Sequence, residues 1–397
     1  MNMTLQELMR AATQLTQSGR LQNATEAIQN ALRGAATAGA VPGTAHAWAD
    51  AGLIAVPGAP LPTPSPWGLE GGVVDVDADP AVNTDSGTGE FSSGTHTHAA
   101  LTRRFKLYRP PGQIGKALPL VVMLHGCTQD PDDFAAGTAM NQRAREQGFF
   151  VLYPQQGTDA NQSRCWNWFK PEHQERDRGE PALIASLTQA VIKQHGIDPR
   201  RVYVAGLSAG GAMAVIVAAA YPELFAAVGV HSGLPSGAAS NVAQALMLMQ
   251  SGQLGRVAQA QGGRGVRAPK ARLRPQLTRP TIVFHGDQDQ TVHPRNGDQV
   301  IAAALGAAAG APDAHARPAG SARVEQGVSA QGRRYTRSTQ QGGQGQILTE
   351  HWLVHGAGHA WSGGHANGSY TDASGPDATL EMLRFFFEHP QAARSEG

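Results

Sequence analysis

From residue 99 onward, short apolar runs alternate with segments of helical character. The apolar runs have the length of strands, and Leu118–Leu124 is nearly unbroken, as expected of a strand that a sheet buries on both faces. The other predicted strands are Leu101–Arg109, Gly148–Tyr153, Val202–Ala205, Phe225–His231, Thr281–His285 and Ile347–Val354. Helical patterns occupy Asp133–Gln147, Glu180–Gln194 and Asp377–Glu388. This alternation predicts βαβ units, and hence an α/β fold with a mostly parallel central sheet and helices on both faces.

The first hundred residues follow two other patterns. Within residues 1–34, apolar residues recur at helical intervals in two stretches, which predicts an N-terminal helical hairpin. Residues 35–98 are rich in Ala, Gly and Pro without periodicity, and we interpret them as a linker. The α/β domain is then expected to span residues 99–390. The hairpin would dock on its own chain, make a dimer, or bind an apolar surface such as a polymer granule.

Charge and composition narrow the class of protein. The chain of 397 residues has a formal net charge of +1, so no global field draws it to nucleic acid or to an anionic membrane. No apolar run approaches the roughly 20 residues that a transmembrane helix needs, and the N-terminus lacks the pattern of a secretory signal. We therefore expect a cytoplasmic protein without a transmembrane segment or a nucleic-acid partner. The basic segment 252–276 is interpreted as a solvated surface insertion, with a polyanion contact as the alternative. A hairpin is expected around Ala322–Thr339.

A serine follows the predicted strand Val202–Ala205 in the sequence Gly-Leu-Ser-Ala-Gly, and small apolar residues of helical character come after it. This order is that of a nucleophile elbow, in which a serine occupies a strained turn between a strand and a helix. Gly206 and Gly210 flank Ser208 at the two positions where a Cβ atom would collide as strand and helix cross. Ser208 is therefore the candidate nucleophile. Gly-x-Ser-x-Gly also arises by chance in a chain with 48 glycines. The assignment of Ser208 as a nucleophile therefore depends on the other motifs that accompany it.

A carboxylate and a histidine follow two later strands. Asp289 and Asp287 both lie after the strand Thr281–His285, and the spacing His-Gly-x-x-Asp-x-x-Val favours Asp289 as the catalytic acid. Asp287 is the alternative. His359 follows the last strand between glycine-rich residues and precedes a tryptophan, and is the candidate base; its local competitors are His355 and His365. The chain order Ser, Asp, His is that of α/β-hydrolases, and the carboxyl ends of parallel strands share one sheet edge.

The segment Leu-His-Gly-Cys-Thr-Gln at the end of the first buried strand is the candidate oxyanion loop. Acyl transfer needs two backbone N–H groups aimed at the developing oxyanion. One is expected from Ala209, the residue after the nucleophile, and the other from Cys127. His125 is interpreted as a brace of this loop, formed by hydrogen bonding, rather than as the catalytic base.

These motifs give the chain a family resemblance. Between about residues 100 and 388 it resembles esterases of the polyhydroxybutyrate depolymerase family. The resemblance rests on Val-Met-Leu-His-Gly-Cys-Thr-Gln-Asp (122–130), Cys-Trp-Asn-Trp-Phe (165–169), Arg-Gly-Glu-Pro (178–181), Gly-Leu-Ser-Ala-Gly-Gly-Ala-Met (206–213), His-Ser-Gly-Leu-Pro (231–235), Gly-Ala-Gly-His-Ala-Trp-Ser-Gly-Gly (356–364) and Gly-Ser-Tyr-Thr-Asp (368–372).

The resemblance implies an α/β-hydrolase fold and a serine esterase that needs no metal or organic cofactor. Its implied substrate is short-chain poly(3-hydroxybutyrate) or its oligomers, with feruloyl or acetyl-xylan esters as the alternative. A granule-associated structural protein is the non-enzymatic alternative. Without a signal pattern, the chain looks like the family branch that acts on intracellular polymer or oligomers, although many members of the family are extracellular.

Two pairs of residues near the predicted site have open roles. Trp166 and Trp361 are candidates for an apolar platform that contacts the substrate. Cys127 and Cys165 would both line the active-site rim. They are expected to form either a disulfide or, in a reducing cytoplasm, a pair of free thiols.

Overall fold

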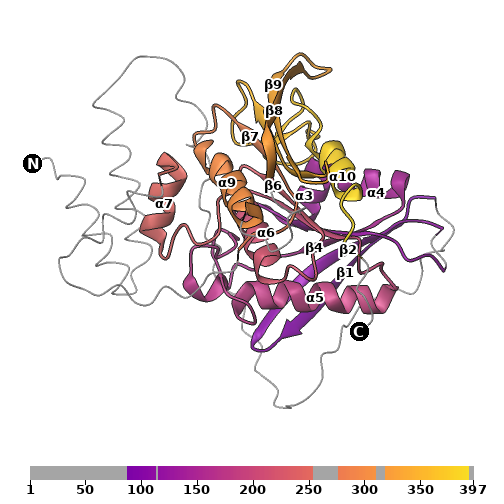
Figure 1. Ribbon diagram of the computed structural model, residues 1–397. Coiled ribbons are helices and arrows are strands. Elements are labelled where there is room, and N and C mark those ends of the chain that lie inside the picture. Colours follow the sequence, from indigo (N-terminus) through magenta and orange to yellow (C-terminus); the bar gives the residue numbers. More distant parts are fainter. Residues whose placement is uncertain (1–86, 113–114, 254–275, 310–317, 393–397) are drawn as a thin grey trace, which may run out of the picture. The chain divides into compact units, whose positions relative to one another are not determined.

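The computed structural model describes residues 87–112, 115–253, 276–309 and 318–392 (Figure 1). All of them belong to one of two units of the chain, Gly72–Gly397. The predicted helical hairpin of residues 1–34, most of the linker and most of the basic segment 252–276 lie outside the described residues.

A single large sheet organises the described part of the chain. Within the described ranges it has ten strands in the order β1-β2-β4-β3-β5-β6-β7-β10-β9-β8. The central strands β4, β3, β5, β6, β7 and β10 pair in parallel, and an antiparallel hairpin extends each edge. The strands are β1 (Glu90–His98), β2 (Leu101–Arg109), β3 (Leu120–Leu124), β4 (Phe150–Pro154), β5 (Val202–Leu207), β6 (Ala227–His231), β7 (Thr281–Gly286), β8 (Pro318–Val328), β9 (Arg334–Gly342) and β10 (Ile347–Val354).

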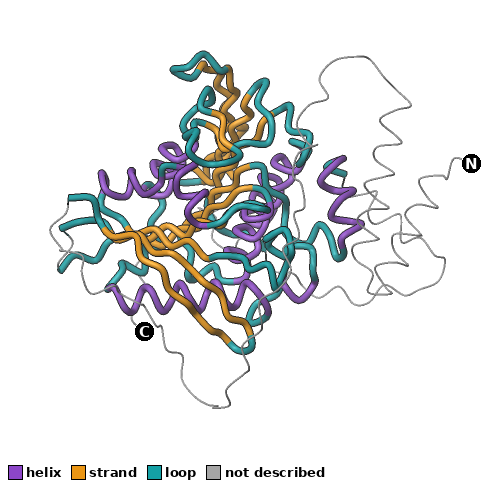
Figure 2. Tube along the Cα trace, turned by 180° about the vertical axis from the view of Figure 1, so that it is seen from behind, coloured by secondary structure: helices purple, strands orange, loops and turns teal. Residues whose placement is uncertain are grey.

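Helices cover both faces of this sheet (Figure 2). Along β3 the side chains alternate, so that Leu120, Val122 and Leu124 join one hydrophobic core and Val121 and Met123 join the other. The first core is closed by α5 (Gly179–His195), α6 (Ala209–Ala220), α7 (Val242–Ser251) and α9 (Arg295–Ala309). The second is closed by α3 (Pro131–Thr138), α4 (Met140–Gln147) and α10 (Ala378–Phe387). The predicted α/β fold with a mostly parallel sheet is confirmed.

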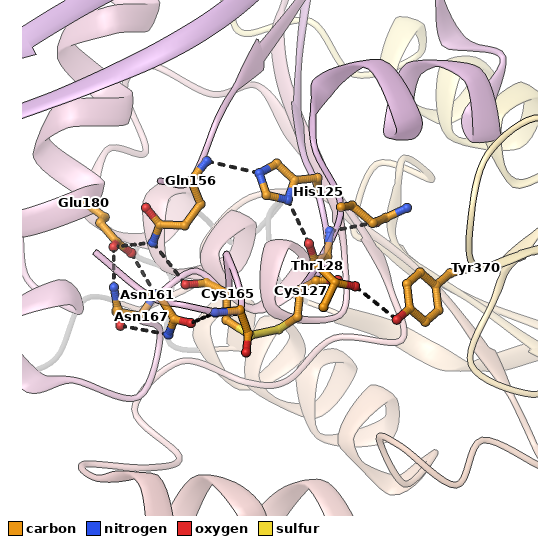
Figure 3. Close-up of a disulfide and its surroundings, with 12 residues drawn as sticks. His125, Cys127, Thr128, Gln156, Asn161, Cys165, Asn167, Glu180 and Tyr370 are labelled. Carbon is orange, nitrogen blue, oxygen red and sulfur yellow. Dashed lines mark hydrogen bonds between the residues drawn. A yellow bond between two sulfur atoms is a disulfide. The ribbon is translucent and has the colours of Figure 1, made fainter. Parts of the chain in front are cut away.

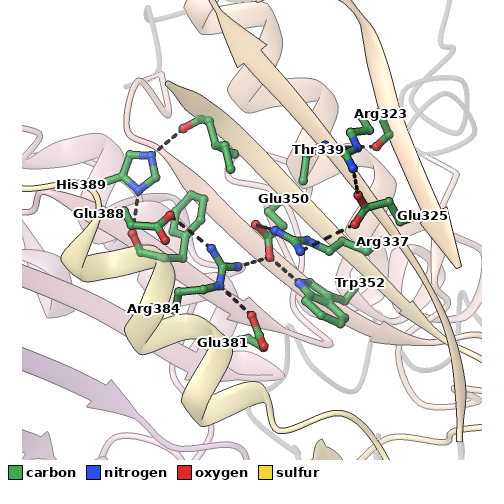
Figure 4. Close-up of polar contacts among 12 residues, drawn as sticks. Arg323, Glu325, Arg337, Thr339, Glu350, Trp352, Glu381, Arg384, Glu388 and His389 are labelled. Carbon is green, nitrogen blue, oxygen red and sulfur yellow. Dashed lines mark hydrogen bonds and ion pairs between the residues drawn. The ribbon is translucent and has the colours of Figure 1, made fainter. Parts of the chain in front are cut away.

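A buried charge joins the edge of the sheet to the last helix. Glu350 of β10 is completely buried, and its carboxylate accepts hydrogen bonds from Arg337 of β9 at 3.0 Å, Trp352 at 2.7 Å and Arg384 of α10 at 2.5 Å (Figure 4). Because an isolated buried carboxylate is costly, these donors are what makes its burial tolerable. The network fixes α10 against β10.

The structure corrects the linker boundary. Residues up to 98 were interpreted as linker, but β1 pairs with β2 in a regular antiparallel ladder from Glu90 to His98. The strand is polar and mostly half-buried, so hydrophobic alternation does not reveal it. Tertiary contacts hold it instead: the ring of Phe91 packs edge-on against Tyr153 at 5.6 Å, and His96 hydrogen-bonds to Ser186 of α5 at 2.9 Å.

Two other predictions concern local elements. The predicted helical stretch around Asp133–Gln147 is confirmed, and the structure divides it into α3 and α4 at Ala139, which has φ 51°. The carbonyl of Thr138 accepts a hydrogen bond from Thr379 of α10, which replaces its helical partner. The predicted hairpin around Ala322–Thr339 is confirmed as β8 and β9.

Within the described residues, no helix has both the length and the apolar character of a membrane span.

Candidate active site

Ser208 occupies the turn between β5 and α6 with a strained backbone. Its φ is 57° and its ψ is −118°, and the residue is 7% exposed. A Cβ atom at Gly210 would lie 2.0 Å from the carbonyl oxygen of Leu124, and one at Gly206 would lie 2.4 Å from the backbone of Gly210. Both positions therefore require glycine. A non-glycine residue with positive φ, held by such close packing, points to a functional site.

Asp289 is a buried carboxylate on the loop that leaves β7. Its Oδ1 accepts hydrogen bonds from the backbone N–H groups of Thr291 at 2.9 Å and Val292 at 2.8 Å. Its Oδ2 lies 2.7 Å from Nδ1 of His359. Burial would raise the pKa of Asp289, but hydrogen bonds from His285 and His359 outweigh it and hold the pKa far below its usual value. The carboxylate is therefore ionised at neutral pH.

The charge on Asp289 fixes the tautomer of His359. An ionised carboxylate only accepts hydrogen bonds, so Nδ1 of His359 carries a proton and donates it. Nε2 of the neutral ring is then left as a base. Among the described residues, His359 is hydrogen-bonded to Asp289, whereas the hydroxyl of Ser208 is not hydrogen-bonded to His359. All three residues follow the carboxyl ends of parallel strands, at one edge of the sheet.

His285 is a contact of the acid that sequence reasoning missed. Its ring is fully buried, and Nε2 lies 2.7 Å from the carbonyl oxygen of Val292 and 3.4 Å from Oδ2 of Asp289. Because a carbonyl oxygen only accepts, Nε2 of His285 carries the proton and also faces the carboxylate. The sequence signal for this contact is the histidine that opens the motif His-Gly-x-x-Asp.

The candidate oxyanion loop after β3 is held by His125 (Figure 3). Burial lowers the pKa of His125 to about 4, so the ring is neutral at neutral pH. The N–H of Gln156 donates to its Nε2 at 3.1 Å, so Nδ1 carries the proton and donates to the carbonyl of Gly126 at 2.7 Å. That carbonyl and the N–H of Cys127 belong to one planar trans peptide group and point in opposite directions. His125 thereby orients the N–H of Cys127, and its predicted role as a brace of the loop is confirmed.

A disulfide and a buried glutamate also hold this loop in place. Cys127 is joined to Cys165, which settles the open alternative in favour of the disulfide in this structure (Figure 3). Glu180 is completely buried and accepts hydrogen bonds from the Gln156 side chain at 2.6 Å and from the backbone of Asn167 at 2.8 Å. The Gln156 side chain also donates to the carbonyl of Cys165 at 3.0 Å. One network thus fixes both ends of the disulfide.

The predicted tryptophan platform does not fit the structure. Trp166 is 0% exposed and Trp361 is 1% exposed, so neither presents a ring face to a substrate. The Trp361 indole donates to Thr379 at 3.0 Å and packs edge-on against Phe134 at 5.5 Å. An apolar side chain that is close to a candidate site residue in the sequence can belong to the core as well as to the rim. Both indoles here are part of the hydrophobic core.

A second aspartate–histidine pair lies beside the first. Asp287 Oδ2 is 2.9 Å from Nδ1 of His355, and Nε2 of the same ring is 2.8 Å from the hydroxyl of Thr336 on β9. The N–H of Gly356 donates to Asp287 at 2.7 Å. A polar pocket of about 630 Å³ opens here, lined in part by Asp287, His355 and Arg333. No group of three or more His, Cys, Asp or Glu residues in the described ranges is arranged to hold a metal ion.

The sheet order, the covering helices and the positions of Ser208, Asp289 and His359 after β5, β7 and β10 define an α/β-hydrolase fold. The family of esterase polyhydroxybutyrate depolymerases matches residues 103–327, and the chain belongs to this family.

Individual relatives cover parts of the chain. Poly(3-hydroxyalkanoate) depolymerase C of Paucimonas lemoignei is 36% identical over 197 residues, which are 48% of this chain and 45% of the relative. Feruloyl esterase B of Thermothelomyces thermophilus is 29% identical over 198 residues, 48% of this chain and 66% of the relative. This chain thus spans about half to two thirds of their length. A solved acetyl xylan esterase from Aspergillus awamori has a similar fold, with a TM-score of 0.50 and 20% identity over 72% of this chain and 94% of that chain.

Proposed function

We propose that the protein is a serine esterase that hydrolyses carboxylic esters through Ser208, His359 and Asp289. The observation that carries the proposal is the buried hydrogen bond of 2.7 Å between Asp289 and His359, on loops at the same sheet edge as the strained Ser208. The bond leaves Nε2 of His359 as a base, and the left-handed backbone of Ser208 is typical of a nucleophile elbow.

The proposed reaction follows from these positions. His359 takes the proton of Ser208 as the serine oxygen attacks the ester carbonyl, and Asp289 stabilises the imidazolium that forms. The N–H groups of Cys127 and Ala209 stabilise the oxyanion, and Ala209 adds the partial positive charge of the first turn of α6. His359 then returns its proton to the leaving alcohol, and water activated by the same residue releases the acyl group from Ser208.

The proposed substrate class is short-chain poly(3-hydroxybutyrate) or its oligomers. Family membership and the depolymerase of Paucimonas lemoignei support this choice. Feruloyl or acetyl-xylan esters are the alternative, which the similarity to feruloyl esterase B favours. Residues 1–34 are a proposed contact with a polymer granule or with a second copy. A purely structural role at a granule would leave the alignment of Asp289 and His359 unused.

The disulfide bears on where the protein works. A bond between Cys127 and Cys165 is typical of proteins in oxidising compartments. We therefore include an extracellular or periplasmic location in the proposal. Fractionation of the native host, with the thiol state of the two cysteines measured in each fraction, tests it directly.

Replacing the nucleophile tests the proposed activity. Ser208→Ala should lower kcat on p-nitrophenyl butyrate by about 10³-fold or more, while the melting temperature stays close to that of the wild type. Parallel assays on amorphous polyhydroxybutyrate, 3-hydroxybutyrate oligomers and ethyl ferulate then rank the substrates. A variant that keeps the wild-type rate refutes the serine mechanism. Granule binding that survives Ser208→Ala but requires residues 1–34, in a protein without esterase activity, would establish the structural role.

A further inference from the structure

Tyr370 is an exposed aromatic residue whose backbone is fixed in an unfavourable conformation. It is 39% exposed and has φ 52°, a region that bulky residues rarely adopt. Its carbonyl accepts a hydrogen bond from the N–H of Trp361 at 2.6 Å. Its neighbour Ser369 donates to Asp133 from both its N–H, at 2.7 Å, and its hydroxyl, at 2.5 Å. The surrounding structure thus imposes this backbone, and strain held in this way is concentrated at functional sites.

The side chain spans the two halves of the proposed catalytic machinery. Its ring lies edge-on to the imidazole of His359, with 6.4 Å between centroids. Its hydroxyl is 3.1 Å from the hydroxyl of Thr128, an exposed residue next to Cys127 on the oxyanion loop (Figure 3). A substrate whose carbonyl reaches the N–H of Cys127 and whose leaving oxygen reaches His359 therefore lies beside Tyr370.

The hydrogen bonds also assign the hydroxyl proton of Tyr370. The Thr128 hydroxyl donates its single proton to the carbonyl of Cys127 at 2.6 Å. Tyr370 must then be the donor in its contact with Thr128, so its own proton is used and the oxygen keeps its capacity to accept. A group on the substrate that donates a hydrogen bond is the complement of this oxygen.

We propose that Tyr370 is a specificity-determining residue that recognises the alcohol part of the ester. The ring packs against the alcohol group beside His359. The phenol oxygen accepts a hydrogen bond from a further hydroxyl on alcohols that carry one, as the sugar alcohols of acetyl-xylan and feruloyl esters do and the leaving unit of poly(3-hydroxybutyrate) does not. The inference rests on the proposed function, because His359 returns its proton to the leaving alcohol and so defines the side of the site on which that group lies.

Two series of esters separate this role from a general effect on the site. In the first, the acyl group is always butyryl and the alcohol is ethanol, benzyl alcohol, propanol or ethylene glycol. In the second, the alcohol is always p-nitrophenol and the acyl group is acetyl, butyryl or hexanoyl. Tyr370→Ala should lower kcat/KM for benzyl butyrate relative to ethyl butyrate about tenfold, mainly through KM, because contact with the ring is lost. The ratios within the acyl series should stay within about twofold of the wild type.

The conservative variant tests the hydroxyl alone. Tyr370→Phe keeps the ring, so it should retain the preference for benzyl butyrate over ethyl butyrate. It should lower kcat/KM for 2-hydroxyethyl butyrate relative to propyl butyrate, an ester of nearly equal size, by about threefold to tenfold, since one neutral hydrogen bond is lost. Leu380→Ala is the matched control, because Leu380 is 42% exposed on α10 and lies outside the proposed site.

The outcomes distinguish this inference from the proposed function. If Ser208→Ala leaves hydrolysis intact, the serine mechanism fails and the inference falls with it. If Ser208→Ala abolishes hydrolysis but both Tyr370 variants keep the wild-type alcohol ratios, the inference alone is overturned. A change confined to the acyl series also overturns it. If Tyr370→Ala proves unstable by its melting temperature, the comparison of Tyr370→Phe with the wild type on the two matched butyrates decides.

Discussion

Two aspartate–histidine pairs bridge the same two loops of this protein, and they differ mainly in burial. Asp289 and His359 are joined at 2.7 Å, with side chains that are 0% and 11% exposed. Asp287 and His355 are joined at 2.9 Å, with side chains that are 28% and 30% exposed. Hydrogen-bond length therefore does not separate them. The buried pair is screened less by solvent, so its two partners attract each other more strongly.

The two pairs differ more in the hydroxyl-bearing residue associated with each histidine, which is Thr336 for His355 and Ser208 for His359. Thr336 is 2.8 Å from His355, so aspartate, histidine and hydroxyl follow one another as they do in a catalytic triad. Yet Thr336 lies within β9, paired with Gln326 of β8 and Leu353 of β10. Backbone N–H groups within paired strands serve the ladder, so none is free to bind an oxyanion. Ser208 instead precedes α6 and lies at the same sheet edge as the oxyanion loop. We therefore propose Ser208 rather than Thr336 as the nucleophile, because Ser208 lies in a strained turn before a helix and Thr336 lies within a paired strand.

Replacing the buried acid should give the largest difference between the pairs. Asp289→Asn should lower kcat on p-nitrophenyl butyrate by about 10³-fold to 10⁴-fold, because an amide can donate to Nδ1 of His359 and so stabilise the tautomer with its proton on Nε2. The melting temperature and kcat, measured on the same preparation, separate loss of the tautomer from loss of the fold.

The matched control is the same substitution in the more exposed pair, Asp287 and His355. Asp287→Asn should lower kcat by less than about tenfold and cost about 1 kcal/mol of stability or less, the usual value for an exposed ion pair. If the two variants exchange their effects, the catalytic acid is Asp287 and the assignment based on burial is wrong.

The acid dependence of stability should show the next largest difference. The pKa values of both Asp289 and Asp287 are lowered, so below the ordinary value of 3.8 the unfolded state binds more protons than the folded state. Their stabilising effect is therefore present above pH 3.8 and is lost as the pH falls through the folded-state pKa. One such group contributes a slope of up to about 1.4 kcal/mol per pH unit.

Urea unfolding between pH 2 and pH 5 measures this slope. Asp289→Asn should flatten it more than Asp287→Asn does, because the hydrogen bonds from His285 and His359 outweigh the effect of burial and lower the pKa of Asp289 further than that of Asp287. Burial lowers the pKa of His125 to about 4, so this histidine also makes the protein less stable in acid, but neither aspartate shifts it and it contributes equally to both variants. An equal slope in the two variants would contradict the distinction between the pairs.

The sequence predicted what is encoded locally. The strained turn at Ser208 and the hydrogen bonds of His125 within its loop depend on residues a few positions apart, which a motif records. The contact of His285 with Asp289 and the burial of Trp361 depend on which side chains meet across the core. Hydrophobicity alone did not reveal β1, because its anchors are two isolated contacts to distant elements. Tyr370 belonged to a quoted motif, but its place beside His359 follows only from the folded path of its loop.

The smallest effect is expected from removal of the Thr336 hydroxyl, which contacts His355 of the more exposed pair. Thr336→Val keeps the β-branched shape that suits β9 and removes only the group facing His355. It should cost about 0.5–1.5 kcal/mol in unfolding free energy, as one hydrogen bond does, and leave kcat on p-nitrophenyl butyrate within about twofold of the wild type. Ser208→Ala, assayed beside it, removes the proposed nucleophilic hydroxyl and should lower kcat by about 10³-fold or more. Loss of activity in Thr336→Val with retained activity in Ser208→Ala would make Thr336 the nucleophile, and the strained turn and oxyanion loop would then be features of the fold alone.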